Sequence, residues 1–104
     1  MVKKMPANNV KITVLKKVKI GEILKEYGAS TVEAECPAVK EGVEYVSKAG
    51  GIPEGFCAWA WADIQRDVAV LAFGGDFPWM KKKGTMISCC TDGLRPVIFK
   101  LERV

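Results

Sequence analysis

The sequence contains no histidine, the side chain that most often exchanges protons near neutral pH. A Ser–His–Asp triad is therefore excluded. No apolar run approaches the roughly 18 residues that a membrane-spanning helix needs, so we predict no membrane insertion. The cysteines have no C-x2-C spacing, the knuckle that structural zinc sites use. Internal repeats and low-complexity tracts are also missing. Sulfur is left as the first element to test for chemistry.

The composition is that of an ordinary globular domain, with 49% hydrophobic and 27% charged residues in a chain of 104. This length predicts one domain, which we place at residues 10–104, after a flexible N-terminal arm at residues 1–9. The arm carries lysines without an apolar stretch behind them, so we expect no secretory signal and a cytoplasmic protein. The net charge of +4 is modest, so no nucleic-acid partner is predicted.

Hydrophobic periodicity predicts an α+β fold. Val10, Ile12 and Val14 alternate with polar residues, as in a strand with one buried face. A stripe of apolar residues from Cys57 to Leu71 has helical spacing and predicts the longest helix. In chain order we expect a strand at 10–18, a helix at 20–27, a strand at 42–46, a helix at 57–71, and strands at 85–90 and 97–104. The order β-α-β-α-β-β predicts a small, mostly antiparallel sheet with one long and one short helix packed on one face.

The most reactive thiol is expected at Cys57, which falls at the start of the long helix. The free amide groups and the dipole of a helix N-terminus stabilise a thiolate, so Cys57 is the candidate nucleophile or redox thiol. Cys57 also heads the apolar stripe, and free cysteine is often buried. Simple packing of Cys57 therefore stays open as the alternative.

Metal ligation is the leading hypothesis for the cysteines as a set. Thiolates from separate segments can hold zinc with a fourth ligand, or an iron–sulfur cluster, and the candidate ligands are Cys36, Cys57, Cys89 and Cys90. Neighbouring side chains in a strand point to opposite faces, so Cys89 and Cys90 are not expected to serve one site together. The sharper hypothesis uses Cys36, Cys57 and one of that pair. Covalent or redox thiol chemistry and purely structural cysteines are the alternatives.

Two further groups of residues are candidates for a pocket beside the cysteines. Arg95 follows Cys89 and Cys90 closely, so it can bind an anion or favour a thiolate, while Asp92 fits either a pocket or an ordinary turn. Trp59 and Trp61 belong to a segment that holds most of the aromatic residues. We expect Trp59 and this segment to cover a pocket or to form a homo-oligomer interface. The alternative is that Trp59 packs under residues 74–80.

The motifs at residues 36–37, 53–61 and 89–97 resemble an uncharacterised family of short cysteine-containing proteins from anaerobic bacteria and archaea. The resemblance runs from about Val10 to the C-terminus and marks Cys57, Trp61, Cys89 and Arg95 as family features. It implies a setting that suits oxygen-sensitive thiols or clusters, and it implies no reaction. The predicted function is a cytoplasmic cysteine-based binding module for a metal ion or iron–sulfur cluster in anaerobic redox metabolism. The alternatives are a thiol-dependent enzyme with Cys57 as its nucleophile, and an oligomeric accessory protein.

Overall fold

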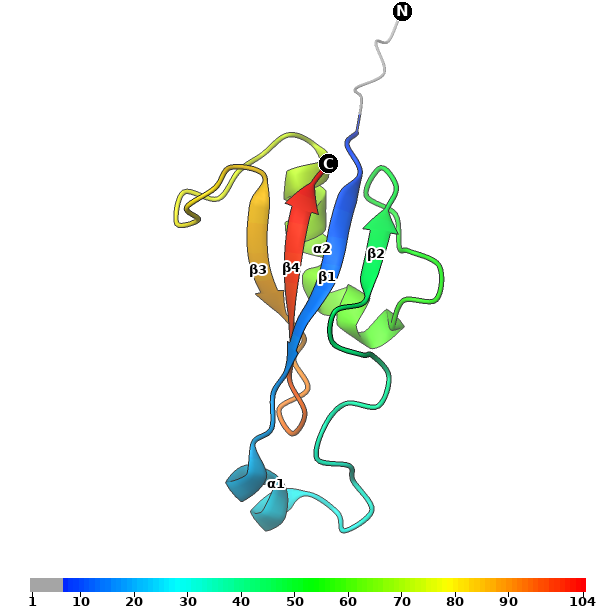
Figure 1. The fold of residues 1–104 in the computed structure, drawn as a ribbon, viewed down its shortest axis with the longest axis vertical. Helices are drawn as coiled ribbons and strands as arrows, with labels where there is room; N and C mark the ends of the chain where they lie inside the picture. Colours follow the sequence, from blue (N-terminus) through cyan, green and yellow to red (C-terminus); the bar gives the residue numbers. More distant parts are fainter. Residues whose placement is uncertain (1–6) are drawn as a thin grey trace, which may run out of the picture.

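The structure, a computed structural model, describes residues 7–104. Within this range the chain forms one four-stranded sheet and two helices (Figure 1). The elements are β1 (Val10–Lys17), α1 (Gly21–Tyr27), β2 (Glu44–Ser47), α2 (Ala58–Ala72), β3 (Thr85–Cys89) and β4 (Val97–Arg103). The strand order is β2-β1-β4-β3, and each neighbouring pair is antiparallel. The predicted α+β class and the order β-α-β-α-β-β are confirmed.

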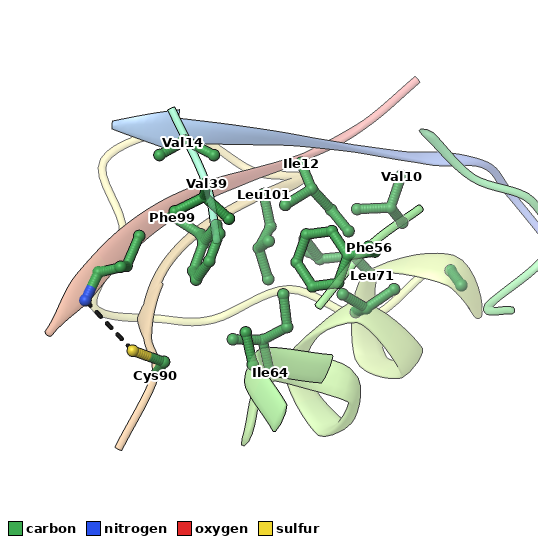
Figure 2. Close-up of a cluster of buried hydrophobic side chains, with 14 residues drawn as sticks. Val10, Ile12, Val14, Val39, Phe56, Ile64, Leu71, Cys90, Phe99 and Leu101 are labelled. Carbon is green, nitrogen blue, oxygen red and sulfur yellow. Dashed lines mark hydrogen bonds between the residues drawn. The ribbon is translucent and has the colours of Figure 1, made fainter. Parts of the chain in front are cut away.

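The core lies between α2 and one face of the two central strands. Alternate residues of β1 and β4 point to this face, and Ile12 pairs with Leu101 while Val14 pairs with Phe99. All four side chains are at most 1% exposed. Figure 2 shows them facing Ile64 and Leu71 of α2, and α2 lies behind the sheet in the view of Figure 1. The other face of the sheet is left to solvent, as is common for antiparallel sheets.

Polar side chains hold the C-terminal end of α2, where the last carbonyl groups of a helix have no partner within the helix. The carbonyl oxygen of Ala72 accepts hydrogen bonds from the backbone N–H and the side-chain amide of Asn8, at 2.7 and 3.2 Å. Arg103 of β4 donates through Nη1 to the carbonyl oxygens of Leu71 and Gly75, at 3.3 and 2.7 Å. A cation at this end also interacts favourably with the helix dipole.

The same arginine fixes the loop between α2 and β3. Arg103 donates through Nη2 to Asp76 at 3.0 Å, and the Asp76 carboxylate also accepts the backbone N–H of Gly84 at 2.6 Å. The Gly84 hydrogen bond, together with Arg103, holds the pKa of Asp76 below its usual value. Gly84 has φ +79°, a conformation that glycine adopts without the steric cost of a side chain.

Two carboxylates one turn apart on α2 connect the helix to β3 and to the segment that follows it. Asp67 is buried and accepts a hydrogen bond from the Ser88 hydroxyl at 2.9 Å. Asp63 accepts the backbone N–H of Thr91 at 2.8 Å, and its two oxygens accept the Thr91 hydroxyl at 3.0 and 2.9 Å. Because residues four apart share one side of a helix, both carboxylates reach the same edge of the sheet.

The two helices differ in their packing, although both were expected on one face of the sheet. α1 lies beyond the end of the sheet, and none of its residues is buried (Figure 1). Ile23 and Tyr27, two large side chains of α1, are 47% and 73% exposed. The reason is spatial: the 15 residues of α2 already cover the apolar face, and β1 carries the chain past the end of the sheet before α1 begins.

The predicted N-terminal arm lies mainly outside the described residues, which exclude residues 1–6. Its last part is bound to the domain, because Asn8 contacts Ala72 and the Asn9 side chain accepts the backbone N–H of Ala49 at 3.2 Å. The ordered chain therefore begins before Val10. No helix in residues 7–104 has the length and apolar character needed to cross a membrane.

The Arg103→Ala variant is expected to be destabilised by about 2 kcal/mol, because it leaves carbonyl groups of the α2 terminus and the Asp76 carboxylate without their donor. Urea unfolding measures this change. Arg66→Ala is the matched control. Arg66 is 85% exposed and its ion pair with Asp67 is long, at 3.7 Å, so its loss should cost about 0.5 kcal/mol or less. Equal destabilisation by the two variants would contradict the role given to Arg103.

Candidate functional site

A pocket of about 590 Å³ opens where three segments meet: the N-terminus of α2, the loop at residues 36–39, and the turn between β3 and β4. We call it the cysteine pocket. Three of its buried apolar lining residues, Val39, Val97 and Phe99, form what we call the floor. Val39 and Phe99 lie side by side in Figure 2, at the same end of the core as Cys90. The volume lies within the range of about 300–1,000 Å³ that is typical of small-molecule sites.

Six of the eight residues singled out from the sequence line the cysteine pocket. They come from different segments that the fold brings together, and they are Cys36, Cys57, Trp59, Cys90, Asp92 and Arg95. Cys89 and Trp61 are not among its lining residues. Three sulfur-bearing side chains therefore share one concave site with an aromatic ring and an ion pair.

Cys57 occupies the N-cap position of α2, which begins at Ala58, one residue later than predicted. Its backbone is extended, with φ −62° and ψ 118°, and its carbonyl oxygen accepts the backbone N–H of Trp61 at 2.9 Å. The thiol makes no capping hydrogen bond, and the residue is half-buried. Cys57 thus lies at the N-terminal end of the helix and lines the pocket.

Cys90 is the buried thiol of the pocket and is part of the strand pairing. Its backbone N–H donates to the carbonyl oxygen of Val97 at 3.0 Å, and its sulfur accepts the backbone N–H of Val97 at 3.2 Å. Figure 2 shows the second contact as a dashed line. Because the sulfur already accepts a hydrogen bond and is 8% exposed, Cys90 is less accessible to a ligand than Cys57.

Cys89 points away from the pocket, which corrects its assignment as a possible ligand beside the other cysteines. The cause is strand geometry: Cys89 is exposed while the next residue, Cys90, is buried on the opposite face. Although the residue is exposed, partial burial of its thiol, followed by the nearby Cys90 and Asp63, raises the pKa of Cys89. The prediction that these two neighbours serve different faces is confirmed, and Cys90 is the one that lines the site.

The turn between β3 and β4 is held by Asp92, as the turn interpretation predicted. Its Oδ1 accepts the backbone N–H groups of Leu94 and Arg95, at 3.0 and 3.1 Å. Its Oδ2 lies 3.3 Å from Nε and 3.2 Å from Nη2 of Arg95. Asp92 therefore sets both the backbone of the turn and the direction of the guanidinium. Thr91, which Asp63 holds, fixes this turn to α2.

The two tryptophans near the start of α2 have different environments. Trp59 is 73% exposed and lines the cysteine pocket, so the expectation that it covers a pocket is supported over packing under residues 74–80. Trp61 packs edge-on against Phe56, with 6.1 Å between ring centroids, and belongs to the border of the core. Trp61 is not among the pocket-lining residues, and it lies on the apolar stripe predicted for this helix, because two residues along a helix turn the side chain to the other side from Trp59.

The cysteines were also expected to bind zinc or an iron–sulfur cluster. Among residues 7–104, no three Cys, Asp or Glu side chains form a group that could hold a metal ion. The thiols of Cys36, Cys57 and Cys90 line one pocket without forming such a group, so the arrangement as it stands does not fit a resident metal. All four cysteines are free thiols.

Sequence reasoning missed two contributors to the site. Val39 follows Cys36-Pro37 in a segment predicted only as loop, and it is 7% exposed and part of the core. Thr91 was missed because nothing in its local sequence indicates that a carboxylate 28 positions earlier would hold it.

Fold and site together define a small α+β protein with a thiol-lined pocket beside its only long helix in the described part of the chain. No protein-family model matches the chain, and no curated protein or solved structure matches it either. The resemblance to a family from anaerobic bacteria and archaea stays a prediction.

Alkylation of Cys89 should be slow at pH 7 for an exposed thiol, because its raised pKa leaves a smaller fraction as thiolate. The rate should keep rising with pH beyond the midpoint of an ordinary cysteine, about pH 8.5. Iodoacetamide labelling followed by mass spectrometry measures the pH profile at this residue. The same residue in urea is the control, and a folded-state midpoint at or below the urea value would contradict the assignment.

Proposed function

We propose that this protein is a thiol-dependent catalyst or binder of a small molecule, with Cys57 as the reacting group in the cysteine pocket. The observation that carries the proposal is the position of Cys57: it is half-buried, it caps the N-terminus of α2, and it lines a pocket of about 590 Å³. Without a histidine in the chain, activation of the thiol has to come from its surroundings, and the helix terminus is such a source.

The proposed step is attack by the Cys57 thiolate on an electrophilic carbon of the bound molecule. A sulfur–carbon bond forms, and the leaving group departs with the electron pair of the bond that breaks. Cys36 borders the same pocket, and Cys90 lies at its buried end. The floor is apolar and buried, and an apolar wall strengthens electrostatic interactions inside the pocket.

Binding of zinc or an iron–sulfur cluster is the second candidate function. It is favoured by one observation, the presence of three of the four cysteines along one pocket. It requires these cysteines to move closer together, because the described residues form no metal-binding group as they stand. Free thiols suit the reducing cytoplasm, which we propose as the location. A homo-oligomer formed through the aromatic segment would use its exposed members, Trp59, Phe73 and Trp79.

Cys57 in the folded protein should react with iodoacetamide at pH 7 about three to ten times faster than the same cysteine in urea, because the helix terminus stabilises its thiolate. Competition labelling and peptide mass spectrometry give the rate for each cysteine separately. Cys89 is the internal control and should show no acceleration.

The position at the helix terminus can be tested without removing the thiol. In Ala58→Pro the fixed φ of proline suits the first helical residue, so the variant should keep the faster reaction of Cys57. Trp59→Gly weakens the first turn and should reduce the acceleration. A Cys57 rate in the wild-type protein equal to its rate in urea would overturn the proposal.

Anaerobic purification followed by an absorption spectrum and metal analysis decides between the two candidates. The thiol proposal predicts protein without stoichiometric zinc or iron that keeps the fast reaction of Cys57. The metal-binding function would replace the thiol proposal if stoichiometric metal is found and it protects Cys36, Cys57 and Cys90 from alkylation while Cys89 stays unprotected.

A further inference from the structure

We propose that the ligand of the cysteine pocket is a small organic anion, with a carboxylate that binds Arg95 and a planar apolar body that lies between the floor and Trp59. This inference rests on the proposed function, since it names the class of molecule presented to Cys57. It is carried by the juxtaposition in one pocket of a guanidinium, an exposed indole ring and a buried apolar floor.

The charged residues of the pocket favour an anion over a cation. Asp92 and Arg95 are the only formally charged side chains in the pocket lining within residues 7–104. The Asp92 carboxylate is already engaged by two backbone N–H groups and by the guanidinium. Asp92 uses Nε and Nη2 of Arg95, while a guanidinium has five N–H groups, so Arg95 retains donors for a second carboxylate.

The position of Arg95 is fixed before a ligand arrives. Asp92 orients the guanidinium, and Asp63 ties the adjacent Thr91 to α2 through one backbone and two hydroxyl contacts. The Arg95 side chain is 29% exposed, so it is partly shielded from solvent and still accessible. A positioned guanidinium loses little conformational entropy when it binds an anion, which favours recognition of a carboxylate.

The rest of the pocket suits an apolar, planar body. Val39, Val97 and Phe99 form the floor and are 7%, 2% and 0% exposed. Trp59, in contrast, is 73% exposed at the pocket, which is unusual for so large an aromatic ring and leaves its face free to stack on a ligand. Burial of a flat apolar group between the ring and the floor would supply affinity that a carboxylate alone does not.

Iodoacetate and iodoacetamide test the charge preference, because they carry the same leaving group and differ in the carboxylate. With either reagent the Cys57 thiolate forms a sulfur–carbon bond and iodide leaves with the electron pair. The ratio of the iodoacetate rate to the iodoacetamide rate at Cys57 should be about fivefold higher in the folded protein than in urea. An unchanged ratio overturns the inference.

Arg95→Gln should return this ratio to its value in urea, and Arg95→Lys should retain part of the preference because it keeps the charge. Arg66→Gln is the matched control, since it removes an arginine that is 85% exposed and outside the pocket lining. Circular dichroism confirms that each variant is folded. A preference that survives in Arg95→Gln, or that Arg66→Gln removes equally, overturns the role of Arg95.

Protection by benzoate and benzyl alcohol tests the two parts of the ligand together. Benzoate should slow iodoacetamide labelling of Cys57 more than benzyl alcohol at the same concentration, and acetate should protect less than benzoate. Equal protection by benzoate and benzyl alcohol would show that the ligand needs no carboxylate. Equal protection by benzoate and acetate would show that it needs no apolar body. Fast labelling of Cys57 by iodoacetamide without any anion preference leaves the proposed function standing and removes only this inference.

Discussion

Burial of one face of the β1–β4 pair under α2 is the interaction on which the other contacts depend. The alternating side chains of two central strands supply the apolar surface, and Ile64, Val68 and Leu71 cover it. Polar contacts then fix the helix along its length. Arg103 holds the C-terminal end, while Asp63 holds the start of the β3–β4 turn. The helix is thereby set in position as well as in orientation.

The cysteine pocket is a consequence of this arrangement. Since α2 is fixed on the sheet, its N-terminus comes to lie beside the end of the β3–β4 hairpin, and the loop that carries Cys36 closes the third side. The turn is braced from two directions, by Asp92 within it and by Asp63 from the helix. Residues separated by more than fifty positions are thus placed in one concave site. Most contacts near the pocket stabilise the fold, and they also position Arg95.

The four thiols have the same chemistry in isolation and acquire different properties from their surroundings. Cys57 lies at a helix terminus and faces a pocket, whereas Cys90 is buried and accepts a backbone hydrogen bond. Cys89 lies on the opposite face with a raised pKa. Such differences matter in a chain without histidine, because the local field and the degree of burial then decide which thiol is present as thiolate.

The sequence by itself determined the helices and strands. Apolar residues repeat every two positions in a strand and every 3.6 positions in a helix such as α2, and these local patterns can be read directly from the chain. It also indicated Cys57 at a helix start and opposite faces for Cys89 and Cys90, which follow from the same periods. Only the tertiary structure decided that Val39 and Thr91 belong to the site and that α1 stays off the sheet. These outcomes depend on which segments meet after α2 has covered the apolar face, and contacts between distant segments leave no periodic signal in the chain.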